Sequence, residues 1–381
     1  MAHLTTVDLS LRFLVLPQLE AVVAAGGEAI GISAPGRFVP EIEAAGVRHV
    51  ALASSTRGMN LGHDLRAAWA LWRVLRRERP DVLHTHNPKP GVYGRIVGRL
   101  SGVPVVVNTV HGLYATEGDR WGRRLAVYAM EAVASRFSDA ELVQNPEDLA
   151  LLRRLRLAPA AKLRLLGNGV DLTRFDASRL DPSVRDDVRG ELGVAADTCV
   201  IGVVGRLVAE KGYRELFAAA ADLGAGYVLA VVGPEDPDKS DSLAPAELAA
   251  ARAAGVRFLG MRTDVERVYA AMDVFALPSH REGFPRAAME AAAMGLPIVA
   301  TDIRGCRQVV SHDVNGLLVP KGDAAALAGA LRAIGADGDR RARMGRASRE
   351  RATSHFDERR VVDIVLRTYA EVATDRLGRA S

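Results

Sequence analysis

The sequence predicts an α/β protein with two domains in series, each built on a mostly parallel sheet covered by helices. The chain has 381 residues, which exceeds the size at which a single core usually stops growing. Short apolar runs alternate with helical patterns in both halves, as in parallel strands joined by crossover helices. Between the halves, the segment LGNGVDLTRFDASRLDPS is rich in Gly, Asn, Asp and Pro and indicates a linker.

The first predicted domain covers residues 1–175. Its apolar runs predict strands at Leu4–Thr6, Glu28–Ser33, Val82–His84, Val105–Asn108 and Glu141–Val143. Helical periodicity predicts helices at Leu11–Ala25, His63–Arg79, Gly91–Leu100, Trp121–Phe137 and Pro146–Leu155. Such alternation is typical of a sheet with helices on both faces.

The second predicted domain covers residues 176–355 and repeats this alternation. Its strands are expected at Cys199–Val204, Tyr227–Val232, Arg257–Leu259, Val274–Ala276, Ile298–Ala300 and Gly316–Val319, with helices between them. The tail from Phe356 to Leu377 has a long helical pattern with no strand after it. It could pack on either domain.

The composition is that of an ordinary soluble globular protein and excludes disordered and fibrous classes. Apolar residues make up 49% of the chain and charged residues 25%. The two cysteines, Cys199 and Cys306, are far apart and have no nearby metal-ligand pattern, which suits buried thiols in a reducing compartment. There is no run of 18 apolar residues and no basic start followed by an apolar core, so we expect a cytoplasmic protein.

Positive charge is concentrated in the first half. The net charge is +4, but residues 1–175 carry 22 Lys and Arg against 16 Asp and Glu, or +6, which leaves −2 for the remainder. The basic half is a candidate for peripheral contact with phosphates or with an anionic membrane, for instance at the inner membrane face. An Arg-rich solvated surface explains the same numbers, and no nucleic-acid partner is expected.

One helix of the basic half carries a tryptophan-containing stripe. The segment LRAAWALWRVLRRER groups its apolar residues on one face, with several arginines on the other. The stripe consists of Leu65, Ala68, Trp69, Trp72 and Leu75. Packing against the sheet is its simplest explanation, and an interfacial role on anionic lipid is the alternative.

The stretch HREGFPRAAME places two carboxylates around a predicted helix start. Gly283 and Pro285 precede the helix, so Glu282 falls in the loop and Glu290 inside the helix. Free amide groups at such a start favour an anion. Glu290 lies among Ala and Met and would need partners if buried, such as sugar or ribose hydroxyls. Two solvated glutamates are the alternative.

Two cations follow the first strand of the second half. In GVVGRLVAEKGYREL, Arg206 and Lys211 lie at a strand-to-helix junction, where ligands of parallel sheets bind. A guanidinium and an ammonium could hold a diphosphate there. Two exposed cations beside Glu210 would give the same pattern.

Histidines mark the strand ends of the first half. His111 precedes a glycine and could hydrogen-bond a sugar hydroxyl, although a structural histidine is an equally simple explanation. His84 and His86 would point to one side of a strand as a zinc pair, but no third ligand is apparent. Asp236 and Asp238 form an Asp-x-Asp that is better explained as a turn in GPEDPDKS.

Taken together, these segments resemble family 4 of the retaining glycosyltransferases (glycosyltransferase group 1). The blocks DVLHTHNPKPGVYGR, VNTVHGLYA, LGNGVDLTRF, GVVGRLVAEKG, ALPSHREGFPRAAMEAAAMGLPIVATDIRG and NGLLVP occur in the family's order. The resemblance implies the GT-B fold, in which two Rossmann-like domains face each other across a cleft. It also implies that the first domain binds the acceptor, completed by a C-terminal helix at 356–381, and that the second binds a nucleotide-sugar donor.

The resemblance assigns roles at the donor site. Arg206 and Lys211 would bind the diphosphate and stabilise it as a leaving group, and Glu290 would take the ribose hydroxyls. Glu282 would take hydroxyls of the transferred sugar. The backbone of Gly283-Phe284 would do the same.

Further contacts are implied for the base and for the reacting sugar. The nucleobase would lie near Gly260-Met261-Arg262, and His111 would approach the sugar from the other domain. The catalytic set would then be His111, Arg206, Lys211 and Glu282. No metal is implied, because the two cations supply the positive charge at the leaving group.

Two departures from the family pattern are visible. Many relatives have a Gly-rich loop after the first strand, whereas this chain has TTVDLS at residues 5–10. The strand begins almost at Met1, so we expect that the start could be truncated. Gln308 stands where relatives often have Glu.

The expected function is retaining transfer of a hexose from a UDP- or GDP-sugar, with no cofactor, to a lipid-linked or polysaccharide acceptor of a cell-surface glycan. The alternatives are a GT-B enzyme acting on small natural products, a nucleotide-sugar epimerase or hydrolase using the two carboxylates, and a non-catalytic partner subunit. The resemblance favours the first.

Overall fold

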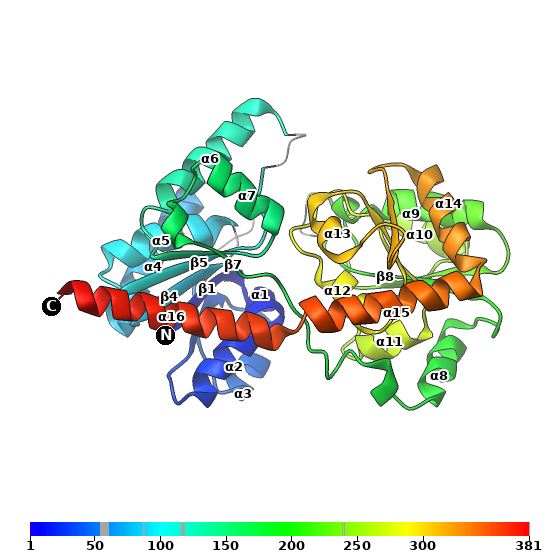
Figure 1. Cartoon of the computed structure of the whole chain (residues 1–381), viewed down its shortest axis with the longest axis horizontal. Helices are drawn as coiled ribbons and strands as arrows, with labels where there is room; N and C mark the ends of the chain where they lie inside the picture. The colour runs from blue at the N-terminus through cyan, green and yellow to red at the C-terminus, as the bar shows by residue number, and fades with distance from the viewer. Residues whose placement is uncertain (54–60, 87, 116–118, 238, 240, 381) are drawn as a thin grey trace. The chain divides into compact units, whose positions relative to one another are not determined.

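The protein consists of two compact units, each organised around its own parallel sheet (Figure 1). The computed structural model describes residues 1–53, 61–86, 88–115, 119–237, 239 and 241–380. The first unit contains Met1–Gly167 and Arg359–Ser381, and the second contains Asn168–Glu358.

Among the described residues, the first sheet has seven parallel strands in the order β3-β2-β1-β4-β5-β6-β7. They are β1 (Ala2–Val7), β2 (Ile30–Ala34), β3 (Arg48–Ala51), β4 (Val82–His86), β5 (Val105–Val110), β6 (Ala140–Val143) and β7 (Leu163–Leu165). Strands β3 and β7 were not predicted. Both are short edge strands that contain arginine, so neither produces an apolar run.

The helices of the first unit cover both faces of this sheet. They are α1 (Asp8–Ser10), the π-helix η1 (Leu11–Val15), α2 (Leu16–Ala24), α3 (Val39–Ala44), α4 (Leu61–Glu78), α5 (Pro88–Leu100), α6 (Trp121–Ala134), α7 (Pro146–Arg154) and α16 (Glu358–Ala380). The helix predicted from Leu11 is preceded by helical turns that begin at Asp8. The Asp8 carboxylate accepts hydrogen bonds from the backbone N–H groups of Leu9 and Phe38, at 2.8 Å each.

The C-terminal helix α16 packs on the first sheet, as Figure 1 shows (red ribbon). Its buried residues Val361, Val365, Tyr369 and Val372 contact a cluster of valines and leucines from β4, β5 and β6. A break at Phe356 and Asp357 separates α16 from α15. The tail therefore belongs to the unit that contains the N-terminus.

Over the part of the chain that the structure describes, the second sheet has six parallel strands in the order β10-β9-β8-β11-β12-β13. They are β8 (Cys199–Val204), β9 (Tyr227–Val232), β10 (Arg257–Gly260), β11 (Val274–Leu277), β12 (Ile298–Thr301) and β13 (Gly316–Val319). The helices are α8 (Ser183–Leu192), α9 (Tyr213–Leu223), α10 (Pro245–Ala253), α11 (Val265–Ala271), α12 (Arg286–Ala293), α13 (Arg304–Val309), α14 (Ala324–Gly335) and α15 (Gly338–His355).

Apolar clusters lie on both faces of the second sheet. Along β8, Val200 belongs to one cluster, whereas Ile201 and Val203 belong to the other. This alternation follows from the two-residue period of a strand. The strand order reverses beside β8, which places a ligand crevice at the carboxyl ends of β8 and β11.

The boundary between the units lies after Gly167, not after residue 175 as the sequence suggested. Val170 and Phe175 are buried in the core of the second unit, and Val170 forms a β-bridge with Asp357. These two apolar residues anchor a segment whose polar residues had indicated a free linker.

Helix α4 turns a different face to the sheet than predicted. Ala67, Leu71 and Leu75 are buried. On the other side of the helix, Trp69 is 60% exposed and Trp72 is 43% exposed. The guanidinium groups of two arginines lie over the two indole rings. The helix packs through these residues together with the partly buried Ala70 and Val74, so most of the tryptophan stripe remains on the surface.

The orientation of α4 can be tested with two substitutions. Leu71→Ala should lower the free energy of unfolding by about 2–5 kcal/mol, because it opens a cavity in the core. Trp69→Ala removes a larger side chain but should change it by no more than about 0.5 kcal/mol, because that side chain is exposed. Urea unfolding followed by circular dichroism measures both. A larger loss for Trp69→Ala would contradict the observed orientation.

Candidate donor site at the carboxyl ends of the second sheet

Arg206 lies directly after β8 and pairs with a carboxylate from the loop after β9. Its Nη1 donates to Asp236 Oδ2 at 2.6 Å. The two loops approach closely at Gly233, where φ is +146° and a Cβ atom would lie 1.9 Å from the Gly205 carbonyl oxygen. Glycine is therefore required there. Asp236 thus has a defined partner, whereas Asp238 lies outside the described residues.

Lys211 and Glu282 come from different loops and meet at the crevice. Lys211 ends the 3₁₀-helix η4 (Ala209–Lys211), and its Nζ lies 2.7 Å from Glu282 Oε1. Ser279 Oγ donates to the same oxygen at 2.8 Å. Both charged side chains are largely buried but not sealed, with 24% and 11% exposure. The predicted lysine and loop glutamate therefore form one ion pair.

A second glycine holds these two loops together. Gly212 has φ +74°, and a Cβ atom there would lie 2.0 Å from the Pro278 carbonyl oxygen. The His280 N–H also donates to the Glu210 carbonyl at 2.8 Å. The segment that carries Lys211 is thereby fixed against the segment that carries Glu282.

Gly283 and Phe284 lie between Glu282 and α12. The Phe284 carbonyl accepts a hydrogen bond from Asn168 Nδ2 at 3.2 Å, and its ring packs edge-on against Phe356 at 5.9 Å between centroids. Pro285 caps the helix, so Glu282 lies in the loop and Glu290 inside the helix, as predicted.

Glu290 is buried and already has protein partners. Only 9% of the residue is exposed, which excludes the solvated alternative. Tyr269 Oη donates to Oε2 and Arg286 Nε to Oε1, at 3.0 Å each. Glu290 therefore has the partners that a buried carboxylate needs, and in the structure they are two protein side chains. The i−4 spacing of Arg286 could have revealed one partner, but nothing local to the sequence pointed to Tyr269.

The segment predicted to lie near a nucleobase follows the edge strand β10. Gly260 has φ +64°, and its carbonyl accepts from the Gly233 N–H at 2.8 Å. Arg262 makes a two-pronged pair with Asp264 and contacts Glu191, each at 2.8 Å. These pairs raise the pKa of Arg262 and hold its guanidinium. Met261, between them, is half-buried.

His111 belongs to the first unit and is a neutral side chain. It follows β5, is half-buried, and its Nε2 lies 3.1 Å from His86 Nδ1. Burial lowers the pKa of His111 to about 4, against a smaller opposing effect of its hydrogen bond to Gln144. At neutral pH the ring therefore donates one hydrogen bond and accepts another.

The two histidines of β4 do point to one side, and a third joins them. The ligating atoms of His3, His84 and His86 all lie within 4.8 Å of one another. The sequence showed no third imidazole because His3 lies on β1, far away along the chain, and meets β4 only through strand pairing.

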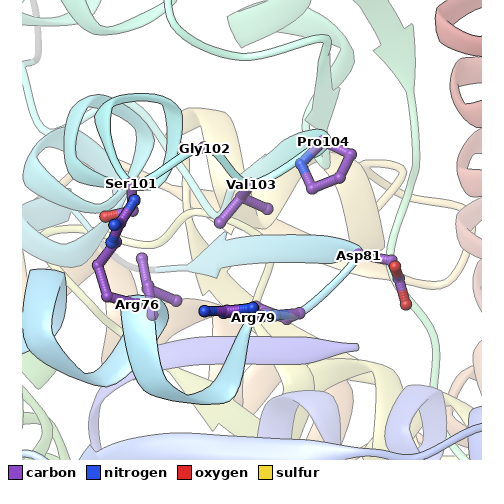
Figure 2. Close-up of a pocket in the computed structure, with 9 residues that line it drawn as sticks. Arg76, Arg79, Asp81, Ser101, Gly102, Val103 and Pro104 are labelled. Atoms are coloured by element: carbon purple, nitrogen blue, oxygen red, sulfur yellow. The ribbon is translucent and has the colours of Figure 1, made fainter.

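A pocket of about 320 Å³ lies at the end of the first sheet where β4 and β5 begin (Figure 2). Figure 2 shows Arg76 and Arg79 at the end of α4, with Asp81 at the start of the next strand. The amino ends of β4 and β5 lie here, and helices α4 and α5 end beside them. Ligands of such sheets bind at the carboxyl ends, so we do not place substrate here.

Comparisons with known proteins agree with this architecture. The family model for the glycosyl transferase 4-like domain matches residues 16–169, and the model for glycosyl transferases group 1 matches residues 184–351. The structure of Anabaena Alr3699/HepE in complex with UDP and glucose superimposes with a TM-score of 0.80. It is 23% identical, and the match covers 97% of this chain and 99% of that one.

Two curated relatives are closer in sequence. The Escherichia coli UDP-Gal:alpha-D-GlcNAc-diphosphoundecaprenol alpha-1,3-galactosyltransferase is 30% identical over 273 residues, 70% of this chain and 69% of that protein. The D-inositol 3-phosphate glycosyltransferase of Saccharomonospora viridis is 33% identical over 318 residues, 79% of this chain and 72% of that protein.

The two Rossmann-like sheets and the sequence matches together define a glycosyltransferase of the GT-B class, which confirms the predicted fold. The chain belongs to the group 1 glycosyltransferases, family 4. Within the part of the chain that the structure describes, no helix is both long enough and apolar enough to span a membrane.

The burial of Glu290 predicts a pH-dependent stability difference. Burial raises the pKa of Glu290 above its value in the unfolded chain. The associated stability is fully present below the unfolded-state pKa and is lost as the pH rises through the folded-state pKa. The Glu290→Gln side chain stays neutral at every pH. As the pH rises, the wild type should therefore lose free energy of unfolding relative to Glu290→Gln. Urea unfolding between about pH 4 and 8 measures the difference, and parallel curves would contradict the assignment.

Proposed function

We propose that this chain transfers a hexose, with retention, from a nucleoside-diphosphate sugar to a lipid-linked or polysaccharide acceptor. The observation that carries the donor part is the presence of two ion pairs, Arg206–Asp236 and Lys211–Glu282, in the loops at the carboxyl ends of β8, β9 and β11. The acceptor class is supported by the E. coli relative, whose substrate is a sugar on diphosphoundecaprenol. The UDP complex of the Anabaena protein makes UDP the first donor nucleotide to test.

The donor diphosphate would bind at Arg206 and Lys211. Each cation now faces a carboxylate, of Asp236 and Glu282 respectively, at hydrogen-bond distance. A diphosphate can take over these contacts, since each charge-assisted hydrogen bond contributes about 1.5–3 kcal/mol. The Ser279 hydroxyl would keep Glu282 in place, leaving that carboxylate to accept from hydroxyls of the sugar.

The rest of the nucleotide would follow the neighbouring loops. Glu290 would accept hydrogen bonds from the ribose hydroxyls, with Tyr269 and Arg286 holding its carboxylate. The backbone at Gly283 and Phe284 would contact the sugar. The base would lie along Gly260-Met261-Arg262, where the ion pairs of Arg262 leave its backbone as the contact surface.

The proposed reaction depends on stabilising the charge that develops on the sugar and the diphosphate. It requires no nucleophilic side chain of the enzyme. As the bond from the anomeric carbon to the phosphate oxygen breaks, the sugar becomes oxocarbenium-like and the diphosphate gains charge. Preorganised cations at the leaving group lower this barrier. The acceptor hydroxyl attacks from the same face, and its proton passes to the departing phosphate oxygen. With two cations in this role, the proposal needs no metal.

The first unit is proposed to bind the acceptor, with His111 as a neutral hydrogen-bonding group at the reacting sugar. A small phosphorylated polyol is the second candidate acceptor. The relative that acts on D-inositol 3-phosphate, at 33% identity, favours it. A product assay with both acceptor classes separates these two possibilities.

The surface of the first unit fits a peripheral contact with an anionic membrane. Trp69 and Trp72 of α4 are exposed beside Arg73 and Arg76. Helix α6 begins with a 75% exposed Trp121 and also exposes apolar side chains further along. Indole rings beside cations suit the boundary between lipid headgroups and acyl chains. Such a location would bring the enzyme to a lipid-linked acceptor.

The donor site is tested by thermal shift against UDP, GDP, ADP and dTDP. One nucleotide at 100 times its dissociation constant should stabilise the protein by about 2.7 kcal/mol. Glu290→Gln should weaken that binding. Lys211→Ala should reduce kcat about 100-fold, as expected for a loss of about 3 kcal/mol of leaving-group stabilisation.

The exposed residue Lys321 provides the matched control, and Lys321→Ala should leave both nucleotide binding and rate unchanged. Unaltered kinetics in Lys211→Ala and Glu290→Gln would overturn the site assignment. Nucleotide release without any acceptor would indicate a hydrolase. Stabilisation by none of the nucleotides, with no product, would indicate a non-catalytic subunit.

Membrane contact is tested by sedimentation with vesicles of phosphatidylglycerol and of phosphatidylcholine. Binding should require the anionic lipid, should fall with salt, and should fall several-fold in Arg73→Ala/Arg76→Ala, since each basic residue near such a surface contributes about 1 kcal/mol. The control Arg343→Ala/Arg346→Ala removes two exposed arginines from α15 and should bind as the wild type does. Equal binding by both double variants would contradict the α4 surface.

A further inference from the structure

One face of the first sheet carries a continuous row of hydrogen-bonded side chains. Apart from His111, none of its members has a role in the proposed transfer reaction. In order along the row they are Thr109, His84, Tyr369, His3, His86 and His111. They come from β5, β4, α16, β1, β4 and the segment after β5, respectively. The row therefore ends at the histidine that we place at the reacting sugar.

The first half of the row is held by Tyr369. His84 Nε2 lies 2.7 Å from Thr109 Oγ1, and its Nδ1 lies 2.5 Å from Tyr369 Oη. The same tyrosine oxygen lies 3.1 Å from His3 Nε2. Removal of this one hydroxyl would interrupt the row between two imidazoles.

The second half of the row consists of three imidazoles. His3 Nδ1 lies 2.9 Å from His86 Nε2, and His86 Nδ1 lies 3.1 Å from His111 Nε2. Strand register explains why they meet. His3 lies opposite His84 across β1 and β4, and Thr109 lies opposite His86 across β4 and β5, so all share one face.

The rings of the row are neutral. His3, His84 and His86 are fully buried, and burial lowers the pKa of each, that of His3 to about 3. The amino terminus is the charged group that acts on His3, and it lowers the pKa of His3 further. At the end of the row, His111 hydrogen-bonds the neutral side chain of Gln144.

A neutral imidazole donates at one nitrogen and accepts at the other. Each ring between His84 and His86 uses both nitrogens within the row, so the direction of one hydrogen bond determines the direction of the next. Because the buried Tyr369 hydroxyl also donates its one proton within the row, the protons all point toward His111 or all point away from it. The tautomer of His111 is therefore coupled to a hydroxyl on the C-terminal helix.

We infer that His3, His84, His86 and Tyr369 are positioning residues that hold His111 as one tautomer in one orientation. Nδ1 of His111, the nitrogen that does not contact His86, then has one defined role, as donor or as acceptor, toward Gln144 or a ligand. The step from His111 to catalysis depends on the proposed transferase function. The coupling within the row does not, and it can be measured without substrate.

A metal centre is the competing explanation for three close imidazoles. A zinc ion would need each ring to present a bare nitrogen to one common point. Here the nearest nitrogens of His3 and His86 are at hydrogen-bond distance from each other, and His84 is engaged by a threonine and a tyrosine. The observed contacts favour shared protons.

The test compares wild type with Tyr369→Phe in full-length protein labelled with ¹⁵N-histidine. In wild type, His3, His84 and His86 should each show one protonated and one bare ring nitrogen, unchanged between about pH 5.5 and 8. In Tyr369→Phe, the ¹⁵N shifts of His111 should move toward a tautomer mixture. If the transferase proposal holds, kcat should fall about 10-fold with the donor KM unchanged, since a misoriented hydrogen bond at the reacting sugar that raises the barrier by about 1.4 kcal/mol slows the reaction tenfold.

Tyr128→Phe removes a half-buried hydroxyl from the same unit and should leave the His111 shifts and kcat as in wild type. Unmoved His111 shifts in Tyr369→Phe would overturn the coupling, even with an active enzyme. Stoichiometric zinc by elemental analysis, or buried histidines that titrate near pH 6.5 in wild type, would overturn it independently of any variant. If the His111 ¹⁵N shifts move as expected but the protein has no transferase activity, the coupling within the row is supported and only the proposed function is rejected.

Discussion

The first unit depends on the docking of a helix from the far end of the chain. A parallel sheet must be covered on both faces, and on one face of β4–β6 the cover is α16. Its four buried apolar side chains each contribute on the order of 1.5–3 kcal/mol of burial free energy. The same contact seals the histidines of β1 and β4 from water and supplies the tyrosine between them. The docking of α16 therefore affects both the stability of the first unit and the electrostatic state of His111.

Two kinds of ion pair occur in this protein, and burial distinguishes their roles. On the face of the first sheet opposite α16, Arg95 is 1% exposed and bonds Glu141 at 2.8 Å and Glu131 at 2.7 Å. Breaking such a pair leaves an uncompensated buried charge, so it is structural. Lys211 and Glu282 remain partly accessible at a strand end. Their contacts can be exchanged for those of an anionic ligand, which is why the proposed donor site lies there.

Much of the fold was predictable because its strands are apolar runs and its helices are periodic. The errors occur where local signals are weak. Strands β3 and β7 are short and carry arginine at sheet edges. The exposed tryptophans of α4 follow the same spacing as a core stripe, and the helix packs through Ala67, Leu71 and Leu75 instead. Val170 and Phe175 appeared to belong to a polar linker because their burial depends on the second core.

The sequence by itself determined the parallel α/β class, the placement of Arg206 after a strand, and the position of Glu282 before a helix, because these depend on local periodicity and turn chemistry. Only the tertiary structure decided which charges meet. Lys211 pairs with Glu282, Glu290 accepts a hydrogen bond from Tyr269, and His3 on β1 meets the histidines of the neighbouring strand β4. These contacts join residues far apart in the chain, and their partners are set by strand order and helix docking, which no local pattern encodes.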